Sequence, residues 1–82
     1  MNPTWESRID QFWDSFDRQD PGRMTSEIRE LLSEREVNDA AALYERASVH
    51  DSLGEESDAV VLYRRALDIG LDAKRKPQAR IQ

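Results

Sequence analysis

The only histidine of the chain, His50, is the residue best suited to acid–base or metal chemistry. Asp51 follows it directly and Glu55 lies about one helical turn further on, an arrangement that could provide a general base or a weak metal site. The sequence has no cysteine, which excludes disulfides and thiolate ligands. Because proximity in sequence supplies neither a nucleophile nor an oxyanion donor, we expect His50 to have a packing role, and we predict no catalytic residue, no cofactor and no metal site.

Charged residues form two further groups that could bind a partner. Four acids are spaced so that they share one helix face, and four bases lie near the end of the chain. The acids are Glu6, Asp10, Asp14 and Asp17, and the bases are Lys74, Arg75, Lys76 and Arg80. We expect the acidic stripe to be a solvated face that an opposing basic surface would stabilise, since like charges four residues apart repel. For the basic tail, a solvated terminus and a contact with phosphate or with the acidic stripe both remain open.

The composition limits the class of protein to which the chain can belong. Its 82 residues, 38% hydrophobic and 35% charged, make at most one small domain and exclude a large enzyme core. With 17 acids against 12 bases the net charge is -5, which is unsuited to broad electrostatic binding of nucleic acid. No window approaches the ~20 apolar residues of a membrane span, and the first residues do not resemble a signal peptide. We therefore expect a cytoplasmic protein that binds neither nucleic acid nor membranes.

Apolar residues recur with helical spacing along the whole chain, which predicts an all-α fold. The first helix is predicted over residues 4–17 and the second over 21–35, with Asp20 as the cap and Pro21 as the first helical residue. A third helix should follow a cap at Asn38 or Asp39 and stop at Gly54, a fourth should close at Gly70, and a short one should begin near Pro77. The first helix carries a mainly aromatic stripe, which should form the core of the first helix pair with Met24, Ile28 and Leu31. The members of this aromatic stripe are Trp5, Ile9, Phe12, Trp13 and Phe16.

The third and fourth predicted helices carry a specific internal pattern. Eight residues follow the spacing 4, 3, 4, 5, 4, 3, 5, namely Leu43, Ala47, His50, Gly54, Ala59, Tyr63, Ala66 and Leu71. This pattern resembles the tetratricopeptide repeat, a helix-turn-helix unit of about 34 residues. The small residues, the turn glycine and Tyr63 match, whereas the usual Trp, Tyr and closing Pro are replaced by Leu43, His50 and Leu71. The segment looks most like the bacterial branch called tetratricopeptide repeat group 5, and this resemblance implies further helices after this point. From the spacing and the short breaks we expect antiparallel helix-turn-helix repeats with about four helices plus a short C-terminal helical segment.

The resemblance divides the chain into three parts. Residues 1–37 are expected to form a degenerate capping helix pair, 38–73 the repeat, and 74–82 a basic tail or the start of an incomplete third repeat. Such an incomplete repeat implies either a fragment of a longer array or a cover supplied by another subunit. We hypothesise a homodimer that covers the outer apolar residues of the repeat, expected to be Val49, Leu53, Val60 and Leu67.

Tetratricopeptide arrays use the inner side of their first helices as a groove for peptides or helices. In this chain the matching positions are Tyr44, Ser48, Asp51 and Ser52, with Ala41 above them. The Lys, Asn and Arg clamp by which some members of the family hold a peptide carboxylate is not provided by Tyr44, Glu45 and Ser48, so a neutral or basic ligand is expected. We predict a non-catalytic module that binds a protein, a peptide or a second copy of itself. The alternative is a small hydrolase or metal-dependent protein that uses His50.

Overall fold

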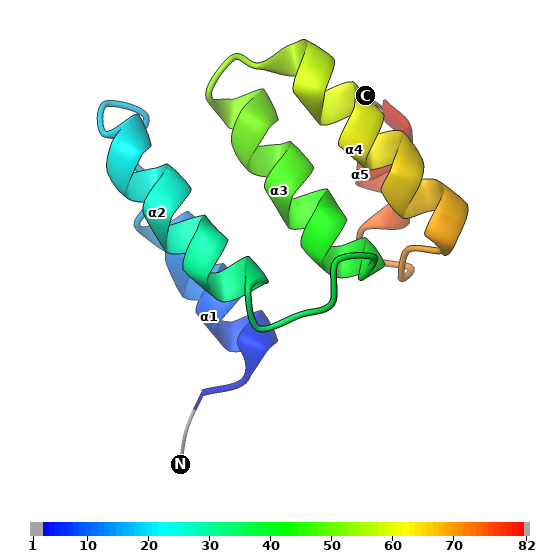
Figure 1. Ribbon diagram of the computed structural model, residues 1–82, viewed down its shortest axis with the longest axis horizontal. Coiled ribbons are helices and arrows are strands. Elements are labelled where there is room, and N and C mark those ends of the chain that lie inside the picture. The colour runs from blue at the N-terminus through cyan, green and yellow to red at the C-terminus, as the bar shows by residue number, and fades with distance from the viewer. Residues whose placement is uncertain (1–2, 82) are drawn as a thin grey trace.

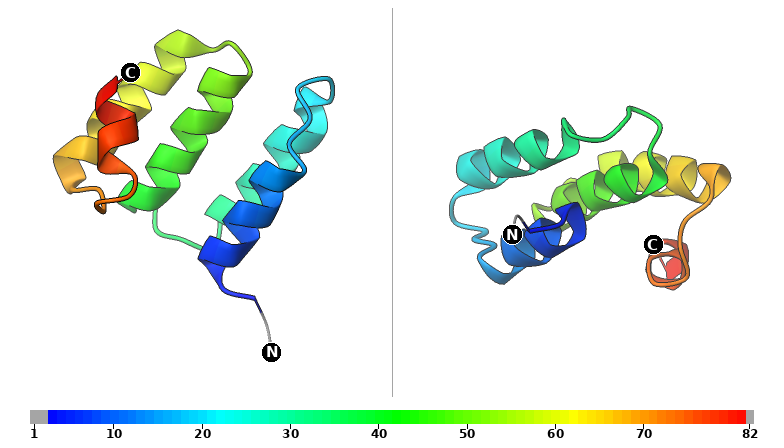
Figure 2. Two further views of the ribbon diagram at one scale, coloured as in Figure 1. Left: turned by 180° about the vertical axis from the view of Figure 1, so that it is seen from behind. Right: turned by 90° about the horizontal axis from the view of Figure 1, so that it is seen from below.

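The computed structural model describes residues 3–81, and every regular element in that range is a helix (Figure 1). The predicted all-α fold is therefore confirmed. The helices are α1 (Trp5–Asp14), α2 (Pro21–Leu32), α3 (Ala40–Ser52), α4 (Glu56–Ile69) and α5 (Lys76–Ile81). The first four form two antiparallel pairs, and α1 and α5 lie on the same side of the layer that contains α3 and α4 (Figure 2).

The first three helices begin where the sequence supplies a capping side chain. Thr4, Asp20 and Asp39 each accept a hydrogen bond from the backbone N–H three residues further on, which satisfies a group that the helix itself leaves unpaired. Pro21 occupies the first helical position of α2, as predicted. Of the two residues proposed to cap the third helix, Asp39 has this role.

Two helices end earlier than predicted. Helix α1 stops at Asp14 rather than at residue 17, and α2 stops at Leu32 rather than at residue 35. A serine follows each helix, and the hydroxyls of Ser15 and Ser33 donate to backbone carbonyls of the preceding turn. Serine side chains compete in this way with the helical hydrogen bonds, so the apolar spacing that continues past them does not extend the helix.

The glycines that end the second pair of helices behave as predicted. Gly54 has a φ of 86° and Gly70 a φ of 119°, conformations that side chains with a Cβ rarely adopt. Helix α5 starts at Lys76, one residue before the predicted start, and Pro77 lies in its first turn, where a missing N–H costs nothing. The helix boundaries near Pro and Gly residues are thus predicted to within one or two residues.

The aromatic stripe of α1 packs against α2 and α3, which confirms it as core. The buried members of this first cluster are Ile9, Phe12, Met24, Ile28, Leu31 and Val49, and half-buried Trp5, Trp13, Phe16, Leu32 and Leu53 pack around them. Phe12 meets the rings of Trp13 and Phe16 edge to face, with centroids 5.1 Å and 5.8 Å away. Edge-to-face contact is the arrangement that aromatic quadrupoles favour, so the stripe is well packed.

A second cluster joins α3, α4 and α5 through small residues. Ala47 and Ala66 are fully buried and Ala59 is 2% exposed, so the three small residues of the repeat pattern all lie in the interior. The buried members of the cluster are Ala47, Ala59, Tyr63 and Ala79. Small side chains let helices approach closely, so this crossing has little room for a larger residue.

One part of the predicted outer apolar stripe is wrong. Val49 is only 4% exposed and belongs to the first cluster, because it lies two residues beyond Ala47 and therefore faces α1 and α2 rather than outward. Leu53 and Leu67 are half-buried against the two clusters. The large apolar side chains that do face solvent are Val37, Val61 and Ile69.

Candidate protein-binding groove

A cavity of about 490 Å³ lies between α1, α3 and α5, and we call it the inner groove. The four residues predicted to face a ligand, Tyr44, Ser48, Asp51 and Ser52, all line it, whereas Ala41 lies elsewhere, beside the α4–α5 connection. The remaining lining residues come from every neighbouring element: Ile9, Asp10, Trp13, Glu45, Tyr63, Lys74, Arg75 and Gln78. The groove is therefore built from both helix pairs and from the C-terminal segment.

Two tyrosines form one wall of the inner groove. The rings of Tyr44 and Tyr63 are 5.5 Å apart between centroids, and the hydroxyls of Ser48 and Tyr63 are hydrogen-bonded at 3.1 Å. Burial raises the pKa of both tyrosines above the ordinary value, so they stay protonated at neutral pH. The wall offers aromatic surface together with neutral hydroxyl groups.

The guanidinium of Arg75 joins three separate parts of the chain at the edge of the groove. Its Nε donates to Oε2 of Glu45 at 2.8 Å, and its two terminal nitrogens reach Glu6 at 2.5 Å and Asp72 at 2.8 Å. Within the basic tail, Arg75 thus contacts Glu6 of the acidic stripe, whereas the other three bases are exposed. The arginine is 6% exposed, and we call it and its three carboxylates the Arg75 cluster.

Burial and hydrogen bonding act against each other in the Arg75 cluster. Desolvation disfavours the charge of Arg75, but the hydrogen bonds to Glu6, Glu45 and Asp72 outweigh it and raise the pKa of the guanidinium. For Asp72, desolvation likewise opposes ionisation, but the hydrogen bonds from Arg75 prevail and lower the pKa of the carboxyl. Arg75 and Asp72 are thus both charged at neutral pH.

Glu45 is the buried anion of the cluster and the residue that sequence reasoning missed. It is 4% exposed, and its two oxygens accept hydrogen bonds from Arg75 and from the indole N–H of Trp13, the latter at 2.8 Å. Glu45 shares a helix stripe with Ala42 and Val49, which are both buried, and Val49 packs in the first cluster. That spacing, with a carboxylate among apolar positions, is the signal that would have marked Glu45 as buried.

The charges that remain available in the inner groove are mostly negative. Asp10, Asp51 and Lys74 line it, and none of them forms an ion pair within the described residues 3–81. The positive charge of Arg75 is offset by the three carboxylates of its own cluster. The groove therefore favours a neutral or positively charged ligand over an anionic one.

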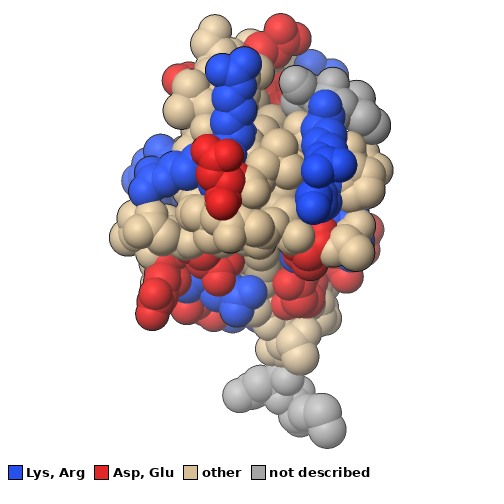
Figure 3. Space-filling view, turned by 90° about the vertical axis from the view of Figure 1, so that its right-hand side faces the viewer, with Lys and Arg blue, Asp and Glu red and all other residues tan. Residues whose placement is uncertain are grey.

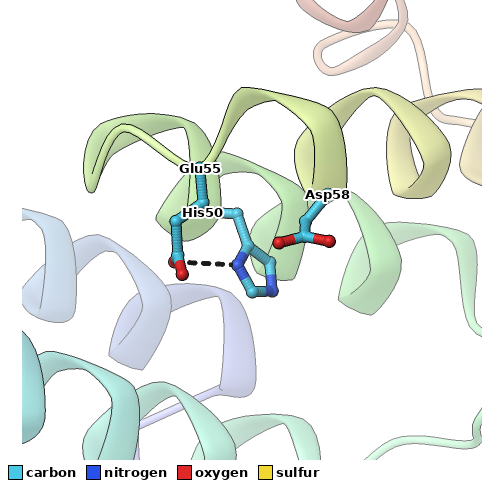
Figure 4. A group of neighbouring side chains, drawn as sticks. All are labelled: His50, Glu55 and Asp58. Atoms are coloured by element: carbon cyan, nitrogen blue, oxygen red, sulfur yellow. Dashed lines mark hydrogen bonds and ion pairs between the residues drawn. The ribbon is translucent and has the colours of Figure 1, made fainter.

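His50 lies outside the inner groove, on the other side of α3. Its Nδ1 is 3.0 Å from Oε1 of Glu55, and the carboxylate of Asp58 completes a group of three (Figure 4). Asp51, the sequence neighbour proposed as its partner, lines the groove instead. Helical geometry explains the difference, because adjacent residues point about 100° apart around a helix axis.

The other residues of the repeat pattern have structural positions. The buried members are Leu43, Ala47, Ala59, Tyr63 and Ala66, whereas Gly54 forms the turn and Leu71 is half-buried against the second cluster.

On the face shown in Figure 3, basic side chains lie among acidic ones rather than in one continuous patch. No helix in the part of the chain that the structure describes is long and apolar enough to cross a membrane.

Comparison with known families gives one match. The family model described as "Tetratrico peptide repeat" matches residues 40–82, which is more than half of the 82-residue chain and spans α3, α4 and α5. Searches of curated proteins and of solved structures found no significant match. The matched segment contains the repeat spacing, the alanine crossing and Arg75.

Proposed function

Because this chain belongs to the tetratricopeptide repeat family, we propose that it is a non-catalytic interaction module that binds a neutral or basic peptide segment in the inner groove. The observation that carries this proposal is the gathering of Tyr44, Ser48, Asp51 and Ser52 in one cavity between α1, α3 and α5. Membership of the family supports a helical module for protein interaction. The residues of the inner groove support a neutral or basic peptide as the ligand.

The binding mode follows from the chemistry of the groove walls. The rings of Trp13 and Tyr44 supply apolar surface, the hydroxyls of Ser48 and Ser52 supply hydrogen bonds, and Asp10 and Asp51 supply negative charge. Arg75 is the groove residue best shaped to hold a peptide carboxylate, but four of its five N–H donors are already used by the carboxylates of its cluster. A carboxylate clamp is therefore not part of the proposed mechanism.

We assign supporting roles to the other parts of the chain. Residues 1–37 act as a capping pair for the repeat over 38–73, since Val49 and Leu53 of the repeat are packed into the first cluster. Residues 74–82 close one side of the inner groove through Lys74, Arg75 and Gln78.

A second copy of the chain is another candidate partner, because Val61 and Ile69 of α4 are 65% and 47% exposed. Sedimentation equilibrium that gives only the monomer mass at micromolar concentration would reject the homodimer.

The peptide proposal can be tested with two fluorescent peptide pools of equal apolar content, one flanked by Lys and Arg and the other by Asp and Glu. Fluorescence polarisation should show tighter binding of the basic pool. The substitution D51K should weaken that binding about 3- to 10-fold, because it replaces an attraction by a repulsion in a partly solvated groove.

The matched control is D68K, which makes the same change of charge at an exposed position of α4 outside the inner groove. It should leave the affinity for the basic pool within about twofold, since exposed charges far from a site are screened. Equal affinities for the two pools, or equal effects of D51K and D68K, would overturn the proposal.

A further inference from the structure

The turn between α3 and α4 brings together three side chains that can bind metal ions (Figure 4). They are His50 from the last turn of α3, Glu55 from the turn, and Asp58 from the first turn of α4. One ligand atom from each lies within 4.8 Å of the other two. The group lies outside the inner groove and has no part in the function proposed above.

The backbone of the turn holds these residues in place. The amide of Glu55 donates to the carbonyl of His50 at 2.7 Å, and Gly54, with its φ of 86°, makes this tight connection feasible. Glu55 precedes the first residue of α4, but its carboxylate does not cap that helix and instead lies beside the imidazole. The carboxylate is therefore free of backbone partners and available to a ligand.

The distances suit a small divalent ion after modest side-chain rotation. Zinc binds imidazole nitrogen and carboxylate oxygen at about 2.0–2.2 Å, so two ligands of one tetrahedral ion lie roughly 3.4 Å apart. The 3.0 Å between His50 Nδ1 and Glu55 Oε1 is close to that spacing. Asp58 is exposed, so its carboxylate can rotate to complete the set.

We propose that His50, Glu55 and Asp58 bind one divalent transition-metal ion of the zinc type. An imidazole with two carboxylates suits zinc, copper or nickel, whereas magnesium and calcium prefer oxygen ligands alone. His50 and Glu55 also line a cavity of about 440 Å³, which leaves room for water at the remaining coordination positions. Arg29 and Arg46 line the same cavity, and their positive charges weaken the binding of a cation.

Metal binding at this position would link the end of α3 to the start of α4. Because the ion binds only the folded turn, it should raise the melting temperature of the repeat. The inner groove should be unaffected, since Asp51 faces the groove and is not a member of the group.

Isothermal titration of Zn²⁺ into the full chain at neutral pH tests the proposal. The expected result is a single site per chain, with binding weakened at least tenfold by H50F and by D58N, and no binding of Mg²⁺. H50F places an aromatic ring at a position where the repeat pattern favours one, and circular dichroism checks that it folds. If H50F does not fold, D58N and E55Q decide, because both positions are exposed.

Two further variants separate a specific site from general attraction to acidic groups. D51N removes a carboxylate adjacent to His50 in sequence and should leave zinc affinity within twofold, whereas R46Q removes a repelling charge and should strengthen it. The proposal is overturned if the parent chain binds no zinc, if D51N weakens binding as much as D58N does, or if a folded H50F binds zinc as the parent does.

Discussion

Arg75 connects three separate parts of this small domain through one side chain. It is 6% exposed and hydrogen-bonded to carboxylates from α1, from α3 and from the loop before α5. A buried ion pair is costly to form, because both charges leave water, but it is also costly to break once it exists. We therefore expect the stability of the inner groove to be most sensitive to substitution of a single residue at Arg75.

We predict that R75M destabilises the fold by about 3–5 kcal/mol, because it leaves the buried carboxylate of Glu45 without its cationic partner. Urea denaturation followed by circular dichroism measures the effect. The control E6Q removes a partner that is half exposed, and it should cost about 1 kcal/mol or less. Equal losses in R75M and E6Q would show that the buried pair of Arg75 and Glu45 contributes no more to stability than the exposed pair.

The pKa of Asp72 predicts a dependence of stability on pH. Hydrogen bonds from Arg75 hold this pKa below its value in the unfolded chain, which is about 3.9. The stabilisation is therefore present above the unfolded pKa and is lost as the pH falls through the lower folded value. D72N should flatten this acid limb of the stability curve. Its amide oxygen can still accept the hydrogen bonds that Asp72 Oδ1 receives from the backbone N–H groups of Lys74 and Arg75. D68N, at an exposed position, should leave the limb unchanged, and a D72N curve that matches the parent curve would contradict the prediction.

At the scale of elements, the crossing of α3 and α4 is set by three buried alanines. Ala59 is 2% exposed, so a larger side chain there must push the two helices apart. The rest of the pair is held by Tyr63 and by the capping of α3 at Asp39.

We predict that A59L lowers the free energy of unfolding by roughly 1–3 kcal/mol through overpacking. The denaturant midpoint should fall with little change in slope. A73L, which adds the same atoms at an exposed position, should change stability by less than about 0.5 kcal/mol. If A59L unfolds at the parent midpoint, the alanine crossing is not tightly packed.

Local sequence signals predicted most helix boundaries, and the early ends of α1 and α2 also have a local cause in the hydroxyls of Ser15 and Ser33. Pro21, Asp39, Gly54 and Gly70 act through their own backbone or that of near neighbours, so they can be recognised without the fold. The Arg75 cluster could not be found in this way, because Arg75 and Glu6 are separated by 69 residues. The groove residues of α3 were predicted because they follow one helical face, whereas Trp13 and Gln78 enter the groove only through packing.

At the scale of the whole molecule, the two helix pairs are connected through Trp13. Its ring packs in the first cluster, and its indole N–H donates to Glu45 of α3. The same carboxylate thus receives a hydrogen bond from the first pair and another from the C-terminal segment.

We predict that W13F destabilises the protein by about 1–3 kcal/mol, because one oxygen of buried Glu45 loses its donor while most of the aromatic packing is kept. Chemical denaturation measures the loss. Adding E45Q on top of W13F should cost less than E45Q costs in the parent chain, since the two residues share an interaction. Strictly additive losses would show that the indole bond contributes nothing.

Repeat arrays are usually linear, with each unit in contact only with its neighbours, so their ends fray independently. The hydrogen bond between Glu6 and Arg75 changes that behaviour, because it joins α1 directly to the loop before α5. Opening either end must break the same contact, so opening one end should make the other easier to open by about 1 kcal/mol or less. In native-state hydrogen exchange, E6Q should therefore lower the opening free energies of amides in both α1 and α5 by about 1 kcal/mol or less, although these helices lie at opposite ends of the sequence.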